Sequence, residues 1–432
     1  MTRYVIVGNS AGGIGAAEAI REVDRESPVT IISEEEYLAY SRPLISEYLA
    51  GEKSLREMLY RDEGFYARRR IETRLGQRVQ RVNPDGWLEL ASGERLEWDR
   101  LILATGGRPI VPPMAGRELK GVYTFTTLGD AQALARALVG SKRVVVVGGG
   151  LIGLSVTEAL VKRGMRVHLV ELKDRVLSLV LDEVASRLVE ERLLQAGVDV
   201  LTGLSVEAVL SRASNPDQVG AVALSDGREL GCDLVVVAIG VAPRTELAMT
   251  AGLQVNRGIV VDRRMATSVP GIYACGDAAE AYDFLLDANR VVPIWPSAYL
   301  GGRVAGLNAA GRPREYPGGT SMNSLNYFGL CVASAGDLGT NGHAGLETIT
   351  RGAERGRYRK VVLRDDRVVG FVMAGEVEPA GLLLGLMRDG VPVRGFEKAL
   401  ASEDFHLIAL PASLRRERLN KLPAVGGNDL PW

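Results

Sequence analysis

The stretch that decides the fold is "VIVGNSAGGIGAAEAI", residues 5–20, close to the start of the chain. A run of β-branched residues enters a turn of small residues, and an Ala-rich segment follows. The same order returns in "VVVVGGGLIGLSVTEAL", residues 144–160. We expect a strand, a glycine turn and a helix in both places, because β-branched residues favour strands and Ala favours helices.

The two turns share one spacing of small residues. In this context, between a strand and a helix, the spacing is the fingerprint of a dinucleotide-binding site. The first position makes the tight turn, the second lets backbone N–H groups approach a pyrophosphate, and the third allows close packing of helix on strand. Ser is small enough for the second position. The three positions are Gly8, Ser10 and Gly13 in the first copy and Gly148, Gly150 and Gly153 in the second.

Each fingerprint expects an acidic residue about 20 residues further on, which accepts a hydrogen bond from a ribose hydroxyl. Glu171 follows "RVHLV" in the second copy, and Glu34 follows "PVTIIS" in the first. Glu34 opens a run of three glutamates, so the choice among neighbours stays open there. One glycine turn alone could be a plain strand-to-helix connection, but two turns with correctly spaced acids predict two dinucleotide sites.

Composition restricts the class of protein further. The 432 residues suggest two to four domains, at about 100–200 residues each. The formal net charge of −1 gives no reason to expect a nucleic-acid or membrane partner. No apolar run reaches about 18 residues, and the strand expected at residues 3–8 leaves no room for a signal peptide. Cys232, Cys275 and Cys331 form no CxxC motif, so we expect a reduced, cytoplasmic protein.

Three more segments repeat the pattern of a buried strand followed by a turn of small residues. "LILATGGRP" at 101–109 and "LVVVAIGVAP" at 234–243 form a second matching pair. "GIYACGDAAE" at 271–280 is a further strand, whose turn presents Asp277. Taken alone, that turn would be read as structural.

Together these motifs resemble the two-dinucleotide flavoproteins, the family of glutathione reductase, NADH oxidase, rubredoxin reductase and ferredoxin reductases. The resemblance spans residues 3 to about 400, and it implies FAD at the first turn and a nicotinamide dinucleotide, NAD, at the second. It further implies that Asp277 bonds the ribityl chain, that Val79 contacts adenine through its backbone, and that Thr105 and Gly106 line the joint between two domains. The expected FAD contacts are Gly8, Ser10, Ala11, Gly12, Gly13, Glu34, Arg42, Pro43, Val79, Thr105, Gly106 and Asp277, and the expected NAD contacts are Gly148, Gly150, Leu151, Ile152, Gly153, Glu171 and Gly240.

The implied fold class is α/β, with two Rossmann-like dinucleotide-binding domains and a C-terminal α/β domain. The FAD domain would be discontinuous, residues 1–115 and 255–320, with the NAD domain inserted at 116–254. Residues 321–400 would form the C-terminal domain, with a hairpin at 358–375 and an amphipathic helix ending at Gly390. Residues 401–432 would be a solvated extension.

The sequence departs from this family on the flavin side. The segment that carries a redox cysteine in disulfide reductases is here "YLAYSRPLISEYLAG", residues 37–51, which has no cysteine. We therefore expect no thiol–disulfide chemistry and interpret all three cysteines as small core residues. "YSRP" resembles the ferredoxin- and rubredoxin-reductase branch, where Arg42 and Pro43 would pack on the flavin. That branch pairs a Lys with a Glu where this chain has Glu47 and Ser155. Either the two have changed together, or Glu47 is simply exposed.

"PIWPSAYLGGRVAGLNAAG" (293–311) and "NSLNYFGLCVASAG" (323–336) resemble flavoprotein subunits of phenylglyoxylate dehydrogenase and tungsten aldehyde oxidoreductase complexes, which couple NAD(H) to iron–sulfur partners. Hydride exchange at flavin N5 needs no protein acid or base, so we expect no catalytic side chain and no metal site in this chain. The expected function is electron transfer between NAD(H) and a redox protein or iron–sulfur subunit, and the chain could be an oligomer. A peroxide-forming NADH oxidase is the alternative. A non-catalytic subunit with structural FAD is disfavoured by the intact second fingerprint.

Overall fold

The computed structural model describes residues 1–340, 345–354, 356–402 and 405–420. By the contacts within the chain it divides into two compact units. One contains residues 1–170 and 204–321, and the other contains residues 171–203 and the described residues from 322 onward. Residues 171–203 thus group with the C-terminal part rather than with the remainder of the expected insert 116–254, and the plan of domains remains a prediction.

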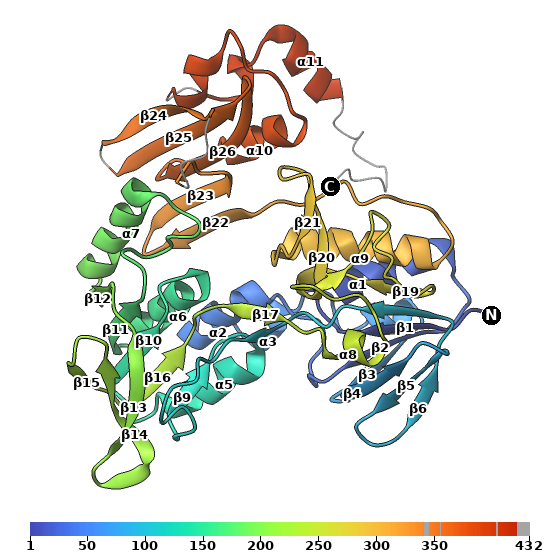
Figure 1. Ribbon diagram of the computed structural model, residues 1–432, viewed down its shortest axis with the longest axis horizontal. Coiled ribbons are helices and arrows are strands. Elements are labelled where there is room, and N and C mark those ends of the chain that lie inside the picture. The colour runs from blue at the N-terminus through green and yellow to red at the C-terminus, as the bar shows by residue number, and fades with distance from the viewer. Residues whose placement is uncertain (341–344, 355, 403–404, 421–432) are drawn as a thin grey trace. The chain divides into compact units, whose positions relative to one another are not determined.

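Two parallel sheets, each built around the strand before a glycine turn, organise the first unit (Figure 1), although the outermost strand of the second sheet, β12, belongs to the second unit. In the first sheet β1 is flanked by β2 and β7, and in the second sheet β10 is flanked by β11 and β16. The first sheet has the order β19-β7-β1-β2-β3, with bounds Ile272–Ala274, Arg100–Leu103, Tyr4–Val7, Val29–Ser33 and Ile71–Leu75. The second has the order β12-β11-β10-β16-β9, with bounds Asp199–Thr202, Arg166–Glu171, Arg143–Val147, Leu234–Val237 and Val122–Thr124.

The apolar runs read from the sequence are these central strands. All four residues of β1 are buried, as are four of the five in β10. Continuous burial is typical of parallel strands that are covered on both faces. A strand with one face in solvent would instead alternate buried and exposed residues. The helices of this unit are α1 Ala11–Val23, α2 Ile45–Ala50, α3 Leu55–Met58, α4 Phe65–Arg68, α5 Leu128–Ala137, α6 Leu151–Lys162, α8 Glu246–Thr250 and α9 Trp295–Ala309, with 3₁₀ turns η1 Arg42–Leu44 and η2 Gly276–Ala278.

Smaller antiparallel pieces complete the first unit. They are the meander β4 Val79–Asn83, β5 Trp87–Leu90 and β6 Arg95–Glu97, the meander β13 Val206–Arg212, β14 Asn215–Leu224 and β15 Glu229–Gly231, the pair β8 Gly107–Pro109 and β17 Val241–Pro243, and the sheet β18 Ile259–Val260, β20 Ala279–Asp283 and β21 Ala288–Arg290. Among them the β8–β17 pair matters most for the site, because its strands connect the two parallel sheets.

The second unit is built on a sheet of order β22-β23-β26-β25-β24, in which all neighbouring strands are antiparallel. The strands β25 and β26 are the predicted hairpin, and α10 is the predicted helix, although it ends at Arg388, with Asp389 as its C-cap before Gly390. The bounds are β22 Met322–Tyr327, β23 Leu330–Gly336, β24 Glu347–Glu354, β25 Arg357–Arg364, β26 Arg367–Ala374, α7 Glu183–Gln195, α10 Ala380–Arg388, α11 Ala412–Asn420, η3 Glu397–Ala401 and η4 Leu407–Ala409.

The extension beyond residue 400 is only partly what the sequence predicted. Phe405 and Leu410 are buried, so the prediction of a solvated segment is wrong for these two residues, whereas residues 406–408 between them are exposed. Residues 421–432 lie outside the described residues. The α/β fold class itself is confirmed. None of the helices that the structure describes is both long and apolar enough to cross a bilayer.

Candidate functional site

The first glycine turn holds its shape through close backbone approaches. Gly8 has φ +121°, and its N–H donates to the carbonyl of Ile32 at 2.8 Å. A Cβ at Gly8 would lie 2.1 Å from the carbonyl oxygen of Ala104, and one at Gly13 would lie 1.9 Å from the carbonyl oxygen of Gly8. Both positions therefore require glycine, as the fingerprint predicts.

Helix α1 continues from this turn into an unusually tight contact with α9 (Figure 1). A Cβ at Gly302 in α9 would lie 2.0 Å from the carbonyl oxygen of Gly12, and one at Gly306 would lie 2.3 Å from that of Ala16. Every residue of α1 from Ala11 to Arg21 is buried. The helix that opens at the first turn is thus fixed on its outer side as well as against its sheet.

The second turn repeats the backbone geometry of the first. Gly148 has φ +108°, its N–H donates to the carbonyl of Val170 at 2.8 Å, and its Cβ would lie 2.6 Å from the carbonyl oxygen of Ala238. A Cβ at Gly153 would lie 1.8 Å from the carbonyl oxygen of Gly148. At Gly150, by contrast, a Cβ would meet no atom within 4 Å, although φ is an ordinary −82°.

Both turns fit a dinucleotide. The N-cap residues Ser10 and Gly150 have extended backbone, and the Ser10 side chain makes no capping hydrogen bond to α1. The open space at Gly150 is where a pyrophosphate would approach the backbone, and no protein atom explains the need for glycine there. Leu151 and Ile152 are the first two residues of α6, at the positive end of its dipole. Ala11 and Gly12 hold the same places in α1.

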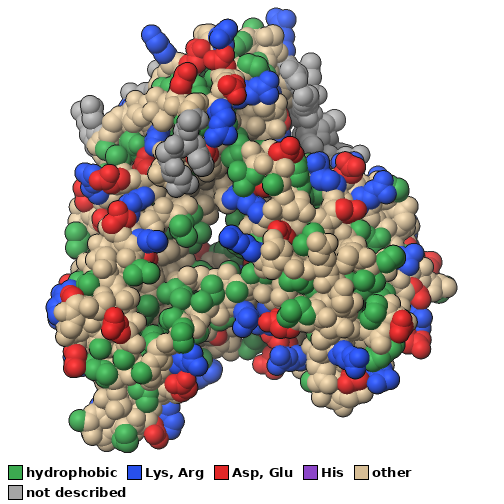
Figure 2. Space-filling view, in the orientation of Figure 1, with side chains coloured by type: hydrophobic (Ala, Val, Ile, Leu, Met, Phe, Trp, Pro, Cys, Tyr) green, Lys and Arg blue, Asp and Glu red, His purple; other side chains and the backbone are tan. Residues whose placement is uncertain are grey.

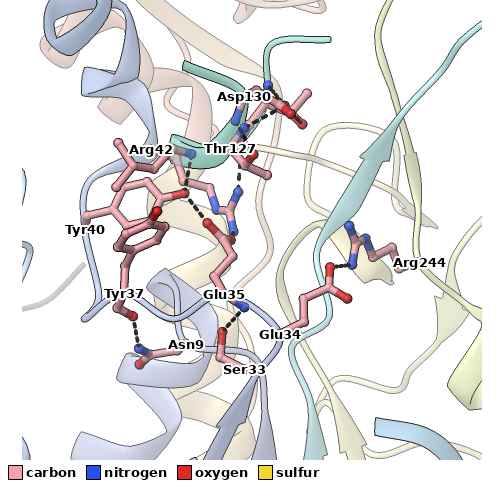
Figure 3. Close-up of polar contacts among 12 residues, drawn as sticks. Asn9, Ser33, Glu34, Glu35, Tyr37, Tyr40, Arg42, Thr127, Asp130 and Arg244 are labelled. Carbon is pink, nitrogen blue, oxygen red and sulfur yellow. Dashed lines mark hydrogen bonds and ion pairs between the residues drawn. The ribbon is translucent and has the colours of Figure 1, made fainter. Parts of the chain in front are cut away.

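The run of glutamates after β2 divides into two environments (Figure 3). The carboxylate of Glu35 accepts from the Tyr40 hydroxyl at 2.6 Å and pairs with Arg42. Glu34 pairs with Arg244, and its side chain is 41% exposed against 20% for Glu35. The geometry favours Glu34 as the acceptor from a ribose, because both oxygens of Glu35 already have partners.

Arg42 and Asp277 place opposite charges beside each other in the first unit. The Arg42 guanidinium donates to the carbonyl of Thr126 at 3.1 Å. Burial acts to lower the pKa of Arg42, but the neighbouring Tyr40 and Glu35 raise it overall, so the cation is secure. Burial raises the pKa of Asp277, opposed by the charge of Arg42, and its carboxyl group accepts no hydrogen bond from the residues that the structure describes. A partner-free carboxyl group here suits a hydroxyl-bearing chain such as ribityl.

Of the remaining predicted FAD contacts, Thr105 and Gly106 lie at a joint between the two parallel sheets. The Thr105 hydroxyl donates to the carbonyl of Arg244 at 2.8 Å, and the N–H of Arg244 donates to the carbonyl of Gly106 at 2.9 Å. Pro43 lies in η1 beside Arg42. Val79 is a buried residue of β4, paired with Leu90. These placements are compatible with the assignments, which stay predictions.

The predicted NAD contacts follow the second turn. Glu171 ends β11 and accepts a hydrogen bond from the backbone N–H of Lys173 at 2.8 Å. Gly240 has φ +125°, and its carbonyl accepts from Ile110 at 3.0 Å. Glu171 is the last residue of β11, and Gly240 lies between β16 and β17. Their contact with NAD stays a prediction.

Of the two explanations for Glu47 and Ser155, the structure favours the simpler one. Glu47 is 40% exposed and lies 3.6 Å from the ammonium of Lys53, while the Ser155 hydroxyl donates to the carbonyl of Leu151 at 2.9 Å. Each residue therefore has a partner on its own segment. Neither needs the other to avoid an unpaired buried charge.

The cysteines are not placed for redox chemistry. Burial raises the pKa of both Cys232 and Cys275 to about 12, so both are neutral thiols at physiological pH. Cys331 is only partly buried in β23, so the expectation that all three are core residues is wrong for this one. Among the described residues, no group of three or more His, Cys, Asp or Glu side chains could hold a metal ion.

Sequence reasoning missed several residues that shape this site. Arg244 carries an ion pair that no local motif announces, and the YSRP motif does not predict the hydrogen bond from Leu128 to Tyr40. Gly302 and Gly306 could have been suspected, because two small residues four apart on one helix face often mark close helix packing.

Comparison with known proteins agrees with this geometry. Residues 2–320 match the pyridine nucleotide-disulphide oxidoreductase family, and residues 322–391 match the rubredoxin NAD+ reductase C-terminal domain. The chain is 33% identical to NADH-dependent phenylglyoxylate dehydrogenase subunit epsilon of Aromatoleum evansii over 89% of this chain and 91% of that one. It is 32% identical to an NADH oxidase of Methanocaldococcus jannaschii over 97% of both chains.

A crystal structure of the covalent putidaredoxin reductase–putidaredoxin complex is also similar, with a TM-score of 0.82 and 30% identity over 90% of this chain and 94% of that one. The match over most of the chain agrees with the two glycine turns, the connecting pair β8–β17 and the turn of Asp277. The chain therefore belongs to the pyridine nucleotide-disulphide oxidoreductase family, which binds FAD and NAD(P)H.

Proposed function

We propose that this protein is an FAD-dependent oxidoreductase that passes electrons between NAD(H) and a separate redox protein carrying an iron–sulfur centre. The observation that carries the proposal is the pair of glycine turns that fit two dinucleotides, in a chain with no cysteine on the expected flavin side. Three cysteines, two of them buried thiols, are too few for the four thiolates of an ordinary iron–sulfur cluster. The second electron carrier would then belong to a partner.

In this proposal FAD supplies the redox chemistry, and the protein binds and orients it. Gly8, Ser10 and Gly13 would admit its pyrophosphate, Glu34 its ribose and Asp277 its ribityl chain. The Arg42 cation would lie beside the flavin. The second turn with Glu171 would hold NAD(H), and the two bound cofactors would supply hydride exchange between nicotinamide and flavin.

Two further expectations belong to the proposal. The discontinuous FAD domain, residues 1–115 and 255–320, is supported by β19, which returns to the first sheet beside β7. Residues 116–254 would be the NAD domain, and 321–400 the C-terminal domain, with the extension from 401. The cytoplasmic location rests on the cysteine pattern of the sequence. Basic and acidic side chains alternate over the face in Figure 2, which suits a partner recognised by local rather than overall charge.

The test is anaerobic oxidation of NADH by the FAD-loaded chain with an artificial dye, followed by the same assay with a reducible iron–sulfur protein copurified from the native source. Fast dye reduction and fast reduction of the iron–sulfur protein are expected. The proposal fails if the flavin is not reduced by NADH, or if dye is reduced but no copurifying redox protein accepts electrons.

A peroxide-forming NADH oxidase is the second candidate, favoured by the similarity to the Methanocaldococcus jannaschii NADH oxidase over nearly the whole chain. The two functions separate in air without any other protein. Peroxide formation at a rate that matches the dye reaction would establish the oxidase and remove the need for a partner. Slow peroxide formation beside a fast dye reaction would support the reductase.

A further inference from the structure

Several polar contacts of the loop after β2 end on residues in the segments that connect the strands of the second parallel sheet (Figure 3). Both β9 and β10, the strands on either side of α5, are members of that sheet. Three of the contacts end on residues 126–132, at the start of α5. The contacts are Tyr37 Oη to Gln132 Oε1 at 2.9 Å, Leu128 N to Tyr40 Oη at 2.9 Å, Arg42 Nη1 to Thr126 O at 3.1 Å and the ion pair of Glu34 with Arg244.

Tyr40 is the centre of this arrangement. Its side chain is buried, and its hydroxyl both donates to Glu35 and accepts the N–H of Leu128, the first residue of α5. Leu128 is itself fully buried, so this N–H has no access to water. A buried hydroxyl that serves one donor and one acceptor fixes the distance between the segments that carry them.

Arg42 adds a second connection in parallel. Its guanidinium pairs with Glu35 and donates to the carbonyl of Thr126, which precedes the N-cap residue Thr127. Thr127 and Asp130 form a capping box, so the first turn of α5 is rigid where Arg42 and Tyr40 reach it. The loop of residues 34–42, which follows β2 of the first sheet, is thus bonded to the capped N-terminal end of α5, which connects two strands of the second sheet.

Hydride transfer is sensitive to such a connection. A displacement of about 1 Å between reacting groups can lower a rate by about two orders of magnitude, even when the cause lies far from the chemistry. In the proposed function the two dinucleotides bind to different sheets, so the rate depends on how firmly the sheets are held together. The loop of residues 34–42 is in place to hold them.

We infer that Tyr40 is a positioning residue for hydride transfer: with Glu35 and Arg42 it fastens the loop after β2 to the first turn of α5 and holds the two dinucleotide sites at their working separation. The inference rests on the proposed function, because it concerns the transfer between NADH and flavin. It assigns Tyr40 no contact with either cofactor.

The experiment is stopped-flow reduction of the bound flavin by saturating NADH without oxygen, comparing Tyr40→Phe with the unaltered chain. The matched control is Tyr4→Phe, which also removes a buried hydroxyl that donates to a carboxylate, that of Asp24 at 3.2 Å, but within the first sheet and α1. We expect Tyr40→Phe to slow flavin reduction about tenfold and Tyr4→Phe to change it less than twofold. FAD content and reduction by dithionite should be normal in both.

A normal rate of flavin reduction in Tyr40→Phe would overturn the inference, as would an equal loss in Tyr4→Phe. Should Tyr40→Phe fail to retain FAD, Tyr37→Phe removes only the bond to Gln132 at the rim of the same contact, and a two- to threefold slowing is expected. An unchanged rate in that variant would then overturn it. Failure of the unaltered chain to accept hydride from NADH would instead defeat the proposed function.

Discussion

The two glycine turns have nearly the same backbone but different surroundings. In both, the first glycine has positive φ and bonds the second strand, and the third glycine leaves under 2 Å for a Cβ. The first turn continues into a helix that α9 covers, so that Ala11–Arg21 is wholly buried. The second continues into α6, where half of the residues are buried. A permanently bound cofactor and a substrate that must leave would need this difference.

The acidic residues that follow β2 and β11 also differ in what holds their side chains. Glu34 is held by Arg244, which is 210 positions away, whereas Glu35 is held by Tyr40 and Arg42 of its own loop. The Glu171 carboxylate accepts a hydrogen bond from a backbone N–H two residues away. Glu34 is thus built into the tertiary structure, and the hydrogen bond from Lys173 to Glu171 is local. Rigid surroundings lower the cost of keeping a bound group ordered, at the expense of rapid exchange.

The largest effect should come from the third glycine of each turn. We expect Gly13→Ala to prevent FAD retention and to lower the free energy of unfolding by about 3 kcal/mol, because its Cβ would lie 1.9 Å from a backbone oxygen. Gly153→Ala should keep FAD but lose reduction by NADH. FAD absorbance per chain and urea unfolding measure both outcomes.

Gly381→Ala, in the first turn of α10 with no atom within 4 Å of the added Cβ, is the control and should be neutral or stabilising. Loss of FAD in both turn variants to the same degree would contradict the assignment of separate ligands to the two turns.

A smaller effect is expected at the second position of the second turn. Gly150→Ala adds a methyl group that meets no protein atom within 4 Å, at an ordinary φ, so the melting temperature and FAD content should stay unchanged. The methyl group would obstruct a pyrophosphate, so KM for NADH should rise about tenfold. Ser10→Ala is the counterpart in the first turn, and it should change neither the FAD content nor the KM for NADH. An unchanged KM in Gly150→Ala would argue against a nucleotide at this turn.

The features predictable from the sequence are those with a local cause. The two strand–turn–helix units, the glycine requirements and the acid at Glu171 follow from spacing within about 30 residues, and each lies in the predicted element. Such features depend on backbone conformation and periodicity, which the neighbouring residues determine.

The features that escaped prediction depend on residues brought together by the fold. Tyr40 bonds to the N–H of Leu128, 88 positions away, and Glu34 pairs with Arg244, 210 positions away. Burial of Phe405 in the extension is of the same kind. A single sequence records that these side chains exist, but their pairing depends on how the sheets and connections pack.

Replacing the acidic residues should have a moderate effect, on nucleotide preference at one site and on FAD retention at the other. We expect the unaltered chain to prefer NADH, because the Glu171 carboxylate repels a 2′-phosphate, and Glu171→Gln to lower the NADH to NADPH ratio of kcat/KM about tenfold. Glu34→Gln should weaken FAD retention and leave that ratio unchanged. Steady-state kinetics with both nucleotides measure the ratio. Equal efficiency of NADH and NADPH in the unaltered chain would contradict the proposed role of Glu171.

The smallest effect is expected from the cysteines, and it tests whether either site uses sulfur. Cys275 lies beside the first turn, its sulfur 3.1 Å from where a Cβ at Gly12 would be, yet burial raises the pKa of its thiol to about 12. Cys232 is equally protonated, and Cys331 lies in the C-terminal sheet. Replacement of all three by Ala should therefore leave the rate of flavin reduction by NADH within about twofold of the unaltered chain, while the cavity at Cys275 costs about 1 kcal/mol of stability. Stopped-flow reduction and urea unfolding of the FAD-loaded triple variant separate the two effects. Because a thiolate would contribute to the rate and not only to packing, a large fall in the rate at full FAD content would mean that the first site uses a cysteine after all.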